Sequence, residues 1–165
     1  MLPGFVNPND LPSSNPVSIS PNGMYICGSG FTPDNGSGAI YWDSDLNIHV
    51  VPSNLAIGLG MDSANAISND GRVIVGHGGV FTNYYGWVYT PETGAVFLDD
   101  YLASHGVMFP AGWRSWQATS LSADGTVIGG MAVGPNNQLQ GFIATVPAPG
   151  TVFLLCLAAA RRRRA

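Results

Sequence analysis

Three stretches of the sequence decide the fold, because they repeat one pattern of eleven residues. They read SISPNGMYICG at 18–28, AISNDGRVIVG at 66–76 and SLSADGTVIGG at 120–130. The shared order is small, aliphatic, Ser, any, Asn or Asp, Gly, two variable residues, Ile, any, Gly. The glycines after the Asn or Asp are 48 and 54 residues apart, close to the repeat length of blade-type arrays. The pattern therefore predicts three β units in tandem.

Each stretch carries the signature of a hairpin. An Asn-Gly or Asp-Gly pair suits a tight turn because both residues tolerate positive φ, and the flanking residues alternate as in a half-buried strand. We therefore expect a tight turn between two antiparallel strands at three pairs: Asn22-Gly23, Asp70-Gly71 and Asp124-Gly125.

Further strands follow each hairpin. Aromatic and β-branched stretches at 39–43, 86–90 and 141–145 predict a third strand in every unit. Turns at 43–47 and 91–94 lead to a fourth strand at 48–51 and at 95–98 in the first two units. Between the second and third units, residues 99–106 predict a short helix with Asp99 as N-cap and Gly106 as stop.

The predicted fold class is all-β: an array of three blade-like antiparallel units. Three units are too few to close a propeller, which takes four to eight, so the array is propeller-like but incomplete. It is either the C-terminal part of a longer array, an open stack or an oligomer. We expect an N-terminal segment or remnant of a preceding repeat at 1–17, the repeats at 18–146 and a separate tail at 147–165.

The repeats resemble a known family. The run at 67–76 followed by a tryptophan-containing strand resembles the HAF-type repeat of bacterial extracellular repeat proteins. The stretch from Leu98 through the third hairpin to Ala144 looks like the last unit of such proteins. The resemblance implies a β-repeat protein displayed outside the cell.

Composition narrows the class of partner. Gly 22 and Pro 12 among 165 residues disfavour a helix bundle, and 45% hydrophobic residues disfavour disorder. Before residue 161 there are two arginines and no lysine against all ten acidic residues. Such a body repels phosphate, so nucleic-acid function is close to excluded. Cys27 and Cys156 form no disulfide framework.

The C-terminal tail has three unlike segments in a fixed order. The residues Pro147, Ala148 and Pro149 precede an apolar run at 151–160, which the basic residues Arg161, Arg162, Arg163 and Arg164 end. This order resembles the PEP-CTERM sorting signal, in which the tripeptide is usually Pro-Glu-Pro, so Ala148 replaces a glutamate. The apolar run is ten residues long, whereas a spanning helix takes about 20.

The sorting resemblance implies a membrane peptidase of the exosortase type as partner, in an exopolysaccharide-producing Gram-negative bacterium. A proline spacer, an apolar plug and a basic stop on the cytoplasmic side fit a transient membrane anchor. We therefore expect an apolar helix at 151–160 and removal of everything after about Pro149. The N-terminus has neither the positive nor the apolar region of a signal peptide, so either the protein is cytosolic or its start is missing. Export would require a signal peptide and therefore implies a truncated or misassigned start.

No stretch carries a catalytic or metal-binding motif. The three histidines, His49, His77 and His105, have no second ligand at metal-binding spacing. The acidic run at 43–47 lacks the glycine and the last carboxylate of a calcium loop and is interpreted as a β-turn. We therefore expect no enzyme activity, no cofactor and no metal.

Tryptophans supply the alternative hypothesis. Trp42 and Trp87 lie on predicted strands and are interpreted as core residues, whereas Trp113 and Trp116 lie off the repeat register. The main expectation is a non-catalytic, exported envelope or matrix protein. The alternative is a lectin-like module that binds matrix exopolysaccharide by stacking sugars on Trp113 and Trp116, aided by Asn136 and Asn137. A third and weaker hypothesis is a secreted hydrolase.

Overall fold

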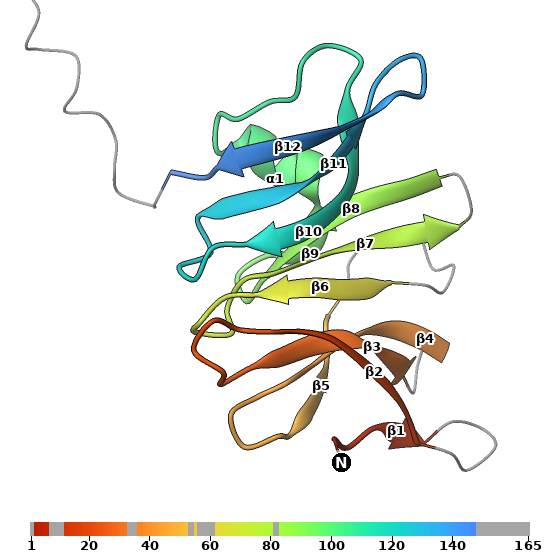
Figure 1. Ribbon diagram of the computed structural model, residues 1–165, viewed down its shortest axis with the longest axis vertical. Coiled ribbons are helices and arrows are strands. Elements are labelled where there is room, and N and C mark those ends of the chain that lie inside the picture. The colour runs from red at the N-terminus through yellow and green to blue at the C-terminus, as the bar shows by residue number, and fades with distance from the viewer. Residues whose placement is uncertain are drawn as a thin grey trace, which may run out of the picture.

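The protein is a stack of three antiparallel β-sheets. The computed structural model describes residues 2–6, 12–32, 36–52, 55, 62–80 and 83–147. We call the sheets unit 1, unit 2 and unit 3, and they succeed one another along the long axis of the molecule with units 1 and 3 at its ends (Figure 1). The all-β, propeller-like array predicted from the repeats is confirmed.

Each unit is a meander in which strands adjacent in sequence pair with one another. Unit 1 contains β1 (Phe5–Val6), β2 (Pro12–Ile19), β3 (Ile26–Thr32), β4 (Gly36–Trp42) and β5 (Ile48–Val50). Unit 2 contains β6 (Ser63–Ile67), β7 (Ile74–Val80), β8 (Asn83–Thr90) and β9 (Gly94–Phe97). Unit 3 contains β10 (Arg114–Leu121), β11 (Val127–Val133) and β12 (Leu139–Thr145), and α1 (Leu98–Ser104) connects β9 to β10.

The strand register confirms the alignment of the predicted third strands. Gly28 of β3 pairs with Ile40, Gly76 of β7 with Trp87 and Gly130 of β11 with Phe142. Each of these glycines also lies close to the backbone of the first strand of its own unit, with which the second strand pairs. A Cβ there would come within 2.1 Å of a backbone oxygen of the first strand in all three units. The repeat therefore ends on Gly because no side chain fits there.

The three Asx-Gly pairs do join antiparallel strands, but the loops are wider than two-residue turns. In unit 3, Ser122 N donates to Val127 O at 2.9 Å and Gly125 N to Ser122 O at 3.0 Å. Only the glycines have positive φ: +77° at Gly23, +70° at Gly71 and +76° at Gly125. The Asn or Asp needs no left-handed backbone, because its side chain is an acceptor inside the loop.

The core consists of two clusters, one at each contact between units. The first joins units 1 and 2 and contains Cys27, Ala39, Ile67 and Trp87 among its buried members. The second joins units 2 and 3 and contains α1 residues as well as strand residues. Because most buried side chains lie between sheets, each unit depends on its neighbour for burial of its apolar faces.

Helix α1 differs from the prediction at its start. The helix begins at Leu98, and Asp99 lies in the first turn instead of at the cap position. Its carboxylate accepts a hydrogen bond from Ser115 N at 2.9 Å, on β10. Asp99 therefore ties the helix to unit 3, a tertiary role that competes with capping. Gly106, with φ of +76°, ends the helix as predicted.

Two strand boundaries also differ. β2 begins at Pro12 and β1 precedes it, so unit 1 extends into the segment that the repeat pattern left outside at 1–17. The repeat marks only the end of each first strand, which explains why the predicted start of unit 1 was too late.

No helix among the described residues is long and apolar enough to cross a membrane.

Candidate binding groove between units 2 and 3

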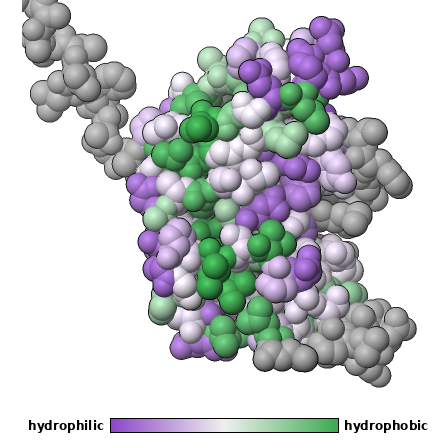
Figure 2. Space-filling model, viewed as in Figure 1, coloured by the Kyte–Doolittle hydropathy of each residue, from purple (hydrophilic) through white to green (hydrophobic). Residues whose placement is uncertain are grey.

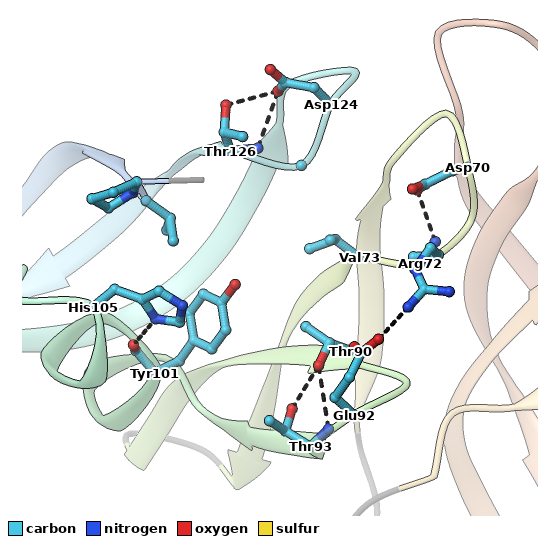
Figure 3. A pocket seen from close by; sticks show the side chains of 13 residues that line it. Asp70, Arg72, Val73, Thr90, Glu92, Thr93, Tyr101, His105, Asp124 and Thr126 are labelled. Carbon is cyan, nitrogen blue, oxygen red and sulfur yellow. Dashed lines mark hydrogen bonds and ion pairs between the residues drawn. The ribbon is translucent and has the colours of Figure 1, made fainter. Parts of the chain in front are cut away.

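A groove of about 450 Å³ lies beside the turns of units 2 and 3. Figure 3 shows its walls: the β6–β7 and β10–β11 loops, the β8–β9 turn and the end of α1. The lining residues carry charges of both signs, hydroxyl groups and two aromatic rings. They are Asp70, Arg72, Val73, Thr90, Glu92, Thr93, Tyr101, His105, Asp124, Gly125, Thr126, Val146 and Pro147.

The two aspartates of the groove are held by their own turns. Asp124 Oδ1 accepts from Ser122 Oγ at 2.5 Å, Thr126 N at 3.1 Å and Thr126 Oγ1 at 2.8 Å. These hydrogen bonds, the one from Ser122 first, lower the pKa of Asp124 to about 2. Asp70 has the same arrangement, and although burial opposes it, hydrogen bonds from Ser68 and Arg72 N lower its pKa. Both carboxylates therefore stabilise loops and stay ionised.

Arg72 and Glu92 form an ion pair across the groove wall (Figure 3). Both side chains are exposed, so the pair is screened by water and adds little stability. Thr90 and Thr93 place their hydroxyl groups next to it, with 2.9 Å between the two oxygens. This wall therefore offers charged and hydroxyl groups that a polar ligand can reach.

The opposite wall is an aromatic pair at the end of α1. The rings of Tyr101 and His105 lie 4.5 Å apart, and His105 Nδ1 is 2.8 Å from Tyr101 O. Burial, together with the charge of Glu92, raises the pKa of the Tyr101 hydroxyl. The groove thus combines an aromatic surface with hydrogen-bonding groups, a combination suited to binding polar ligands with apolar faces.

The three histidines have separate surroundings. His49 Nε2 lies 2.8 Å from Asp43 Oδ2 in unit 1, and this contact, above all, lowers the pKa of Asp43 to about 2. His77 Nδ1 lies 2.9 Å from Asn65 Nδ2 in unit 2, and burial lowers its pKa. Among the residues that the structure describes, no three His, Cys, Asp or Glu side chains are grouped to hold a metal ion.

The acidic run at 43–47 is a turn, as interpreted from the sequence. Asp43 Oδ1 accepts hydrogen bonds from Asp45 N at 3.0 Å and from Asn47 N at 2.9 Å. The turn residue Leu46 has a positive φ of 61°.

Cys27 is a free thiol, and its burial raises its pKa to about 12.

Two of the four tryptophans are buried in the core, as predicted from the sequence, and the other two are half-buried. Trp42 and Trp87 are buried in the core, 0% and 2% exposed. Trp113 packs over the backbone of Gly134, beside the turn that carries Asn136 and Asn137. Trp116 instead faces unit 2, so the two stacking candidates have different partners.

Trp116 belongs to an aromatic cluster that sequence reasoning missed. Its ring lies 5.4 Å from Tyr84, which lies 5.5 Å from His77, and the Arg114 guanidinium is 5.7 Å from the Trp116 ring. Arg114 also donates to Tyr84 O at 2.6 Å. The cluster spans two units, so no local pattern could have found it.

Of the predicted sorting residues, Pro147 lies at the edge of the groove. Ala148, Pro149 and Arg161, Arg162, Arg163 and Arg164 lie outside the described residues. The expected apolar helix at 151–160 lies outside them too.

Comparisons with known proteins place the chain in no family. No family model matches it, and no curated protein matches its sequence. Among solved structures, it is similar to TolB from Acinetobacter baumannii, with 17% identity and a TM-score of 0.48. The similarity covers 79% of this chain and 29% of that one, so this chain spans less than a third of TolB's length.

Proposed function

We propose that the chain is an exported, non-catalytic repeat protein of the cell envelope or extracellular matrix, sorted through its C-terminal tail. The fixed order of proline spacer, apolar run and arginines at 147–165 supports this proposal. An exosortase-type membrane peptidase of a Gram-negative bacterium would be the processing partner. The precursor would be held briefly at the inner membrane, and the mature protein would reach the surface.

The observation that carries the proposal is that the last strand and its final hydrogen bond come before the tail. β12 pairs with β11 along its whole length. Val146 then donates its N–H to Thr126 O at 2.7 Å and is 5% exposed. Cleavage after about Pro149 would therefore leave every described strand in place, as a removable sorting tail requires.

The arginines provide the test of sorting. We expect replacement of Arg161, Arg162, Arg163 and Arg164 by Ser to remove the cytoplasmic stop and impair processing. The ratio of precursor to mature chain in a host with the peptidase measures this. Arg72→Ser is the matched control, because it removes an exposed body arginine and leaves the tail intact. An unchanged ratio in the tail variant would refute the sorting role.

The groove favours a second candidate function, binding of matrix carbohydrate. Tyr101 offers an aromatic surface beside the Arg72–Glu92 pair and the threonine hydroxyls. We expect Tyr101→Ala to weaken binding of exopolysaccharide fragments at least about tenfold, or about 1.4 kcal/mol, in calorimetric titrations. Trp113→Ala serves as the comparison. If it alone abolished binding, the sugar site would lie at the sequence-predicted tryptophan instead.

A further inference from the structure

The two contacts between units use the same pair of faces. We call the face of a sheet that packs on the next unit its forward face, and the other its backward face. In the first core cluster, Cys27 of unit 1 packs forward against Ile67 and Trp87 of unit 2. In the second, Val88 of unit 2 packs forward against Ile128 of unit 3. Forward and backward faces are therefore complementary throughout the chain.

The turns repeat this order along one side of the stack. Asn22 Nδ2 donates to Asn69 O at 2.8 Å, and Asn69 N donates to Ala123 O at 2.9 Å. The turn glycines of units 2 and 3 also contact a side chain from the preceding unit. A Cβ on Gly71 would be 2.5 Å from Tyr25 of unit 1.

The same holds one unit further along, where a Cβ on Gly125 would be 2.7 Å from Val73 of unit 2. Tyr25 and Val73 occupy the same position of the repeat, five residues after its serine. The equivalent residue of unit 3 is Val127. The same repeat position therefore makes this contact at both junctions between units.

Each terminal unit leaves apolar side chains exposed on one face, the forward face in unit 3 and the backward face in unit 1. On the forward side of unit 3, Ile143 is 82% exposed, whereas its equivalent Val88 is 0% exposed. On the backward side of unit 1, Ile19 is 57% exposed, whereas its equivalent Ile67 is 2% exposed. Gly23 has open space where the other two turn glycines are covered. Figure 2 shows apolar residues interspersed with polar ones from the unit 1 end to the unit 3 end of the molecule.

The N-terminal segment covers only part of the backward face of unit 1. Residues 2–6 lie over Trp42, whose Nε1 donates to Pro3 O at 2.8 Å, and Ile40 and Trp42 are both 0% exposed. Ile19, at the end of β2 on the same face, stays 57% exposed, and the turn at Gly23 has open space. A partner on unit 1 would therefore meet the end of β2 and the turn, beside the segment that covers Trp42.

We propose that the forward face of unit 3 binds the backward face of unit 1 in a second copy of this chain. Two such contacts close a ring of six units, within the four to eight of known propellers. A second copy is the fitting occupant because each free face complements the other, and a head-to-tail contact that closes gives a finite assembly. Val127 would cover Gly23 of the other copy, and Ala123 N would donate to its Pro21 O.

The mass of the full chain in solution tests the ring. Light scattering after size exclusion at tens of micromolar is expected to give twice the chain mass of 17.3 kDa. A monomer at that concentration would overturn the proposal. A series of ever larger species would also overturn it, because it would mean that the contacts do not close.

Two single variants test which faces meet. Ile143→Asp and Ile19→Lys each bury an unpaired charge in the proposed contact. Each is expected to weaken self-association at least about 100-fold, with the thermal midpoint of the monomer unchanged because both side chains are exposed there. Met108→Asp is the matched control, since Met108 is 80% exposed on the loop before β10 and lies on neither face. If Ile19→Lys left the dimer intact, the copies would meet by unit 3 alone, contrary to the proposal.

Mixing the two variants gives the sharpest arm. A mixed ring has one unaltered contact and one Asp–Lys pair, so the mixture is expected to recover dimer that neither variant forms alone. A mixture that stays monomeric although the unaltered protein is dimeric would rule out the head-to-tail arrangement.

Discussion

The turns of the three units share one hydrogen-bonded geometry, whereas the segments that precede the units differ in structure. In the turns, the distance from Ser Oγ to Asx Oδ1 is 2.7, 2.6 and 2.5 Å in units 1, 2 and 3. The N–H five residues after each serine reaches its Oγ at 3.0, 3.0 and 2.9 Å. The connectors share no such geometry: the segment before β2 contains the short strand β1, whereas the segment between β9 and β10 contains the helix α1.

The difference shows what each region does for the stack. The turns repeat in detail because, at the junctions between units, a turn glycine, a backbone group and the residue two positions after the glycine contact the adjoining unit. The helix α1 contributes by packing, since Leu102 lies in the second core cluster, and packing can be supplied by segments of different structure. Packing tolerates variety in sequence, whereas a hydrogen-bonded loop in a close contact does not.

Truncating the helical connector is expected to have the largest effect. Leu102 is 1% exposed in the second core cluster, so Leu102→Ala removes packing and leaves a cavity. We expect a loss of about 2–5 kcal/mol in the free energy of unfolding, measured with urea. Met108→Ala should cost less than about 0.5 kcal/mol, as at other exposed sites. A loss below about 1 kcal/mol for Leu102→Ala would mean that the connector is not part of the core.

Placing the same methyl group in two turns separates backbone strain from contact between units. Gly125→Ala meets both the left-handed backbone and Val73, for an expected loss of about 2–4 kcal/mol. In the dissociated single chain, Gly23→Ala meets only the backbone, so at a concentration that keeps the chain monomeric the expected loss is about 1 kcal/mol. Urea unfolding of both variants gives the difference. Equal losses would show that the turns do not press on one another.

The smallest effect is expected from replacing Asp124 in the turn of unit 3 by Asn, the residue that unit 1 has at the equivalent position. Asn22 occupies the position of Asp124 and keeps the same acceptor. Because hydrogen bonds lower the pKa of Asp124 from 3.8 to about 2 in the folded state, its stabilisation is present above pH 4 and is lost as the pH falls toward 2. We expect Asp124→Asn to reduce the drop in urea midpoint between pH 5 and pH 3. An identical drop in both proteins would contradict this.

Much of the fold could be predicted because the repeat encodes local rules. The Asx-Gly pairs predicted hairpins, and the aromatic and β-branched stretches at 39–43, 86–90 and 141–145 predicted the third strands, which pair with the second strands in equivalent register. The cap assigned to Asp99 was wrong because a backbone N–H of β10 uses its carboxylate. That partner lies in another unit, and no local pattern contains it.

The groove was beyond sequence reasoning for a similar reason. It brings Arg72 and Tyr101 together from a turn and a helix that no motif links. The bond from Asn69 N to Ala123 O was equally hidden, because it joins backbone atoms at the position where the repeat accepts any residue. Contacts made by backbone atoms leave little trace in side-chain identity.

The intact mass of the exported protein tests the proposed sorting most directly. In a host with an exosortase-type peptidase, mass spectrometry of the mature chain should show that everything after about Pro149 has been removed. The three-unit body would remain complete through Val146. A secreted chain that still ends in Arg161, Arg162, Arg163, Arg164 and Ala165 would contradict the account.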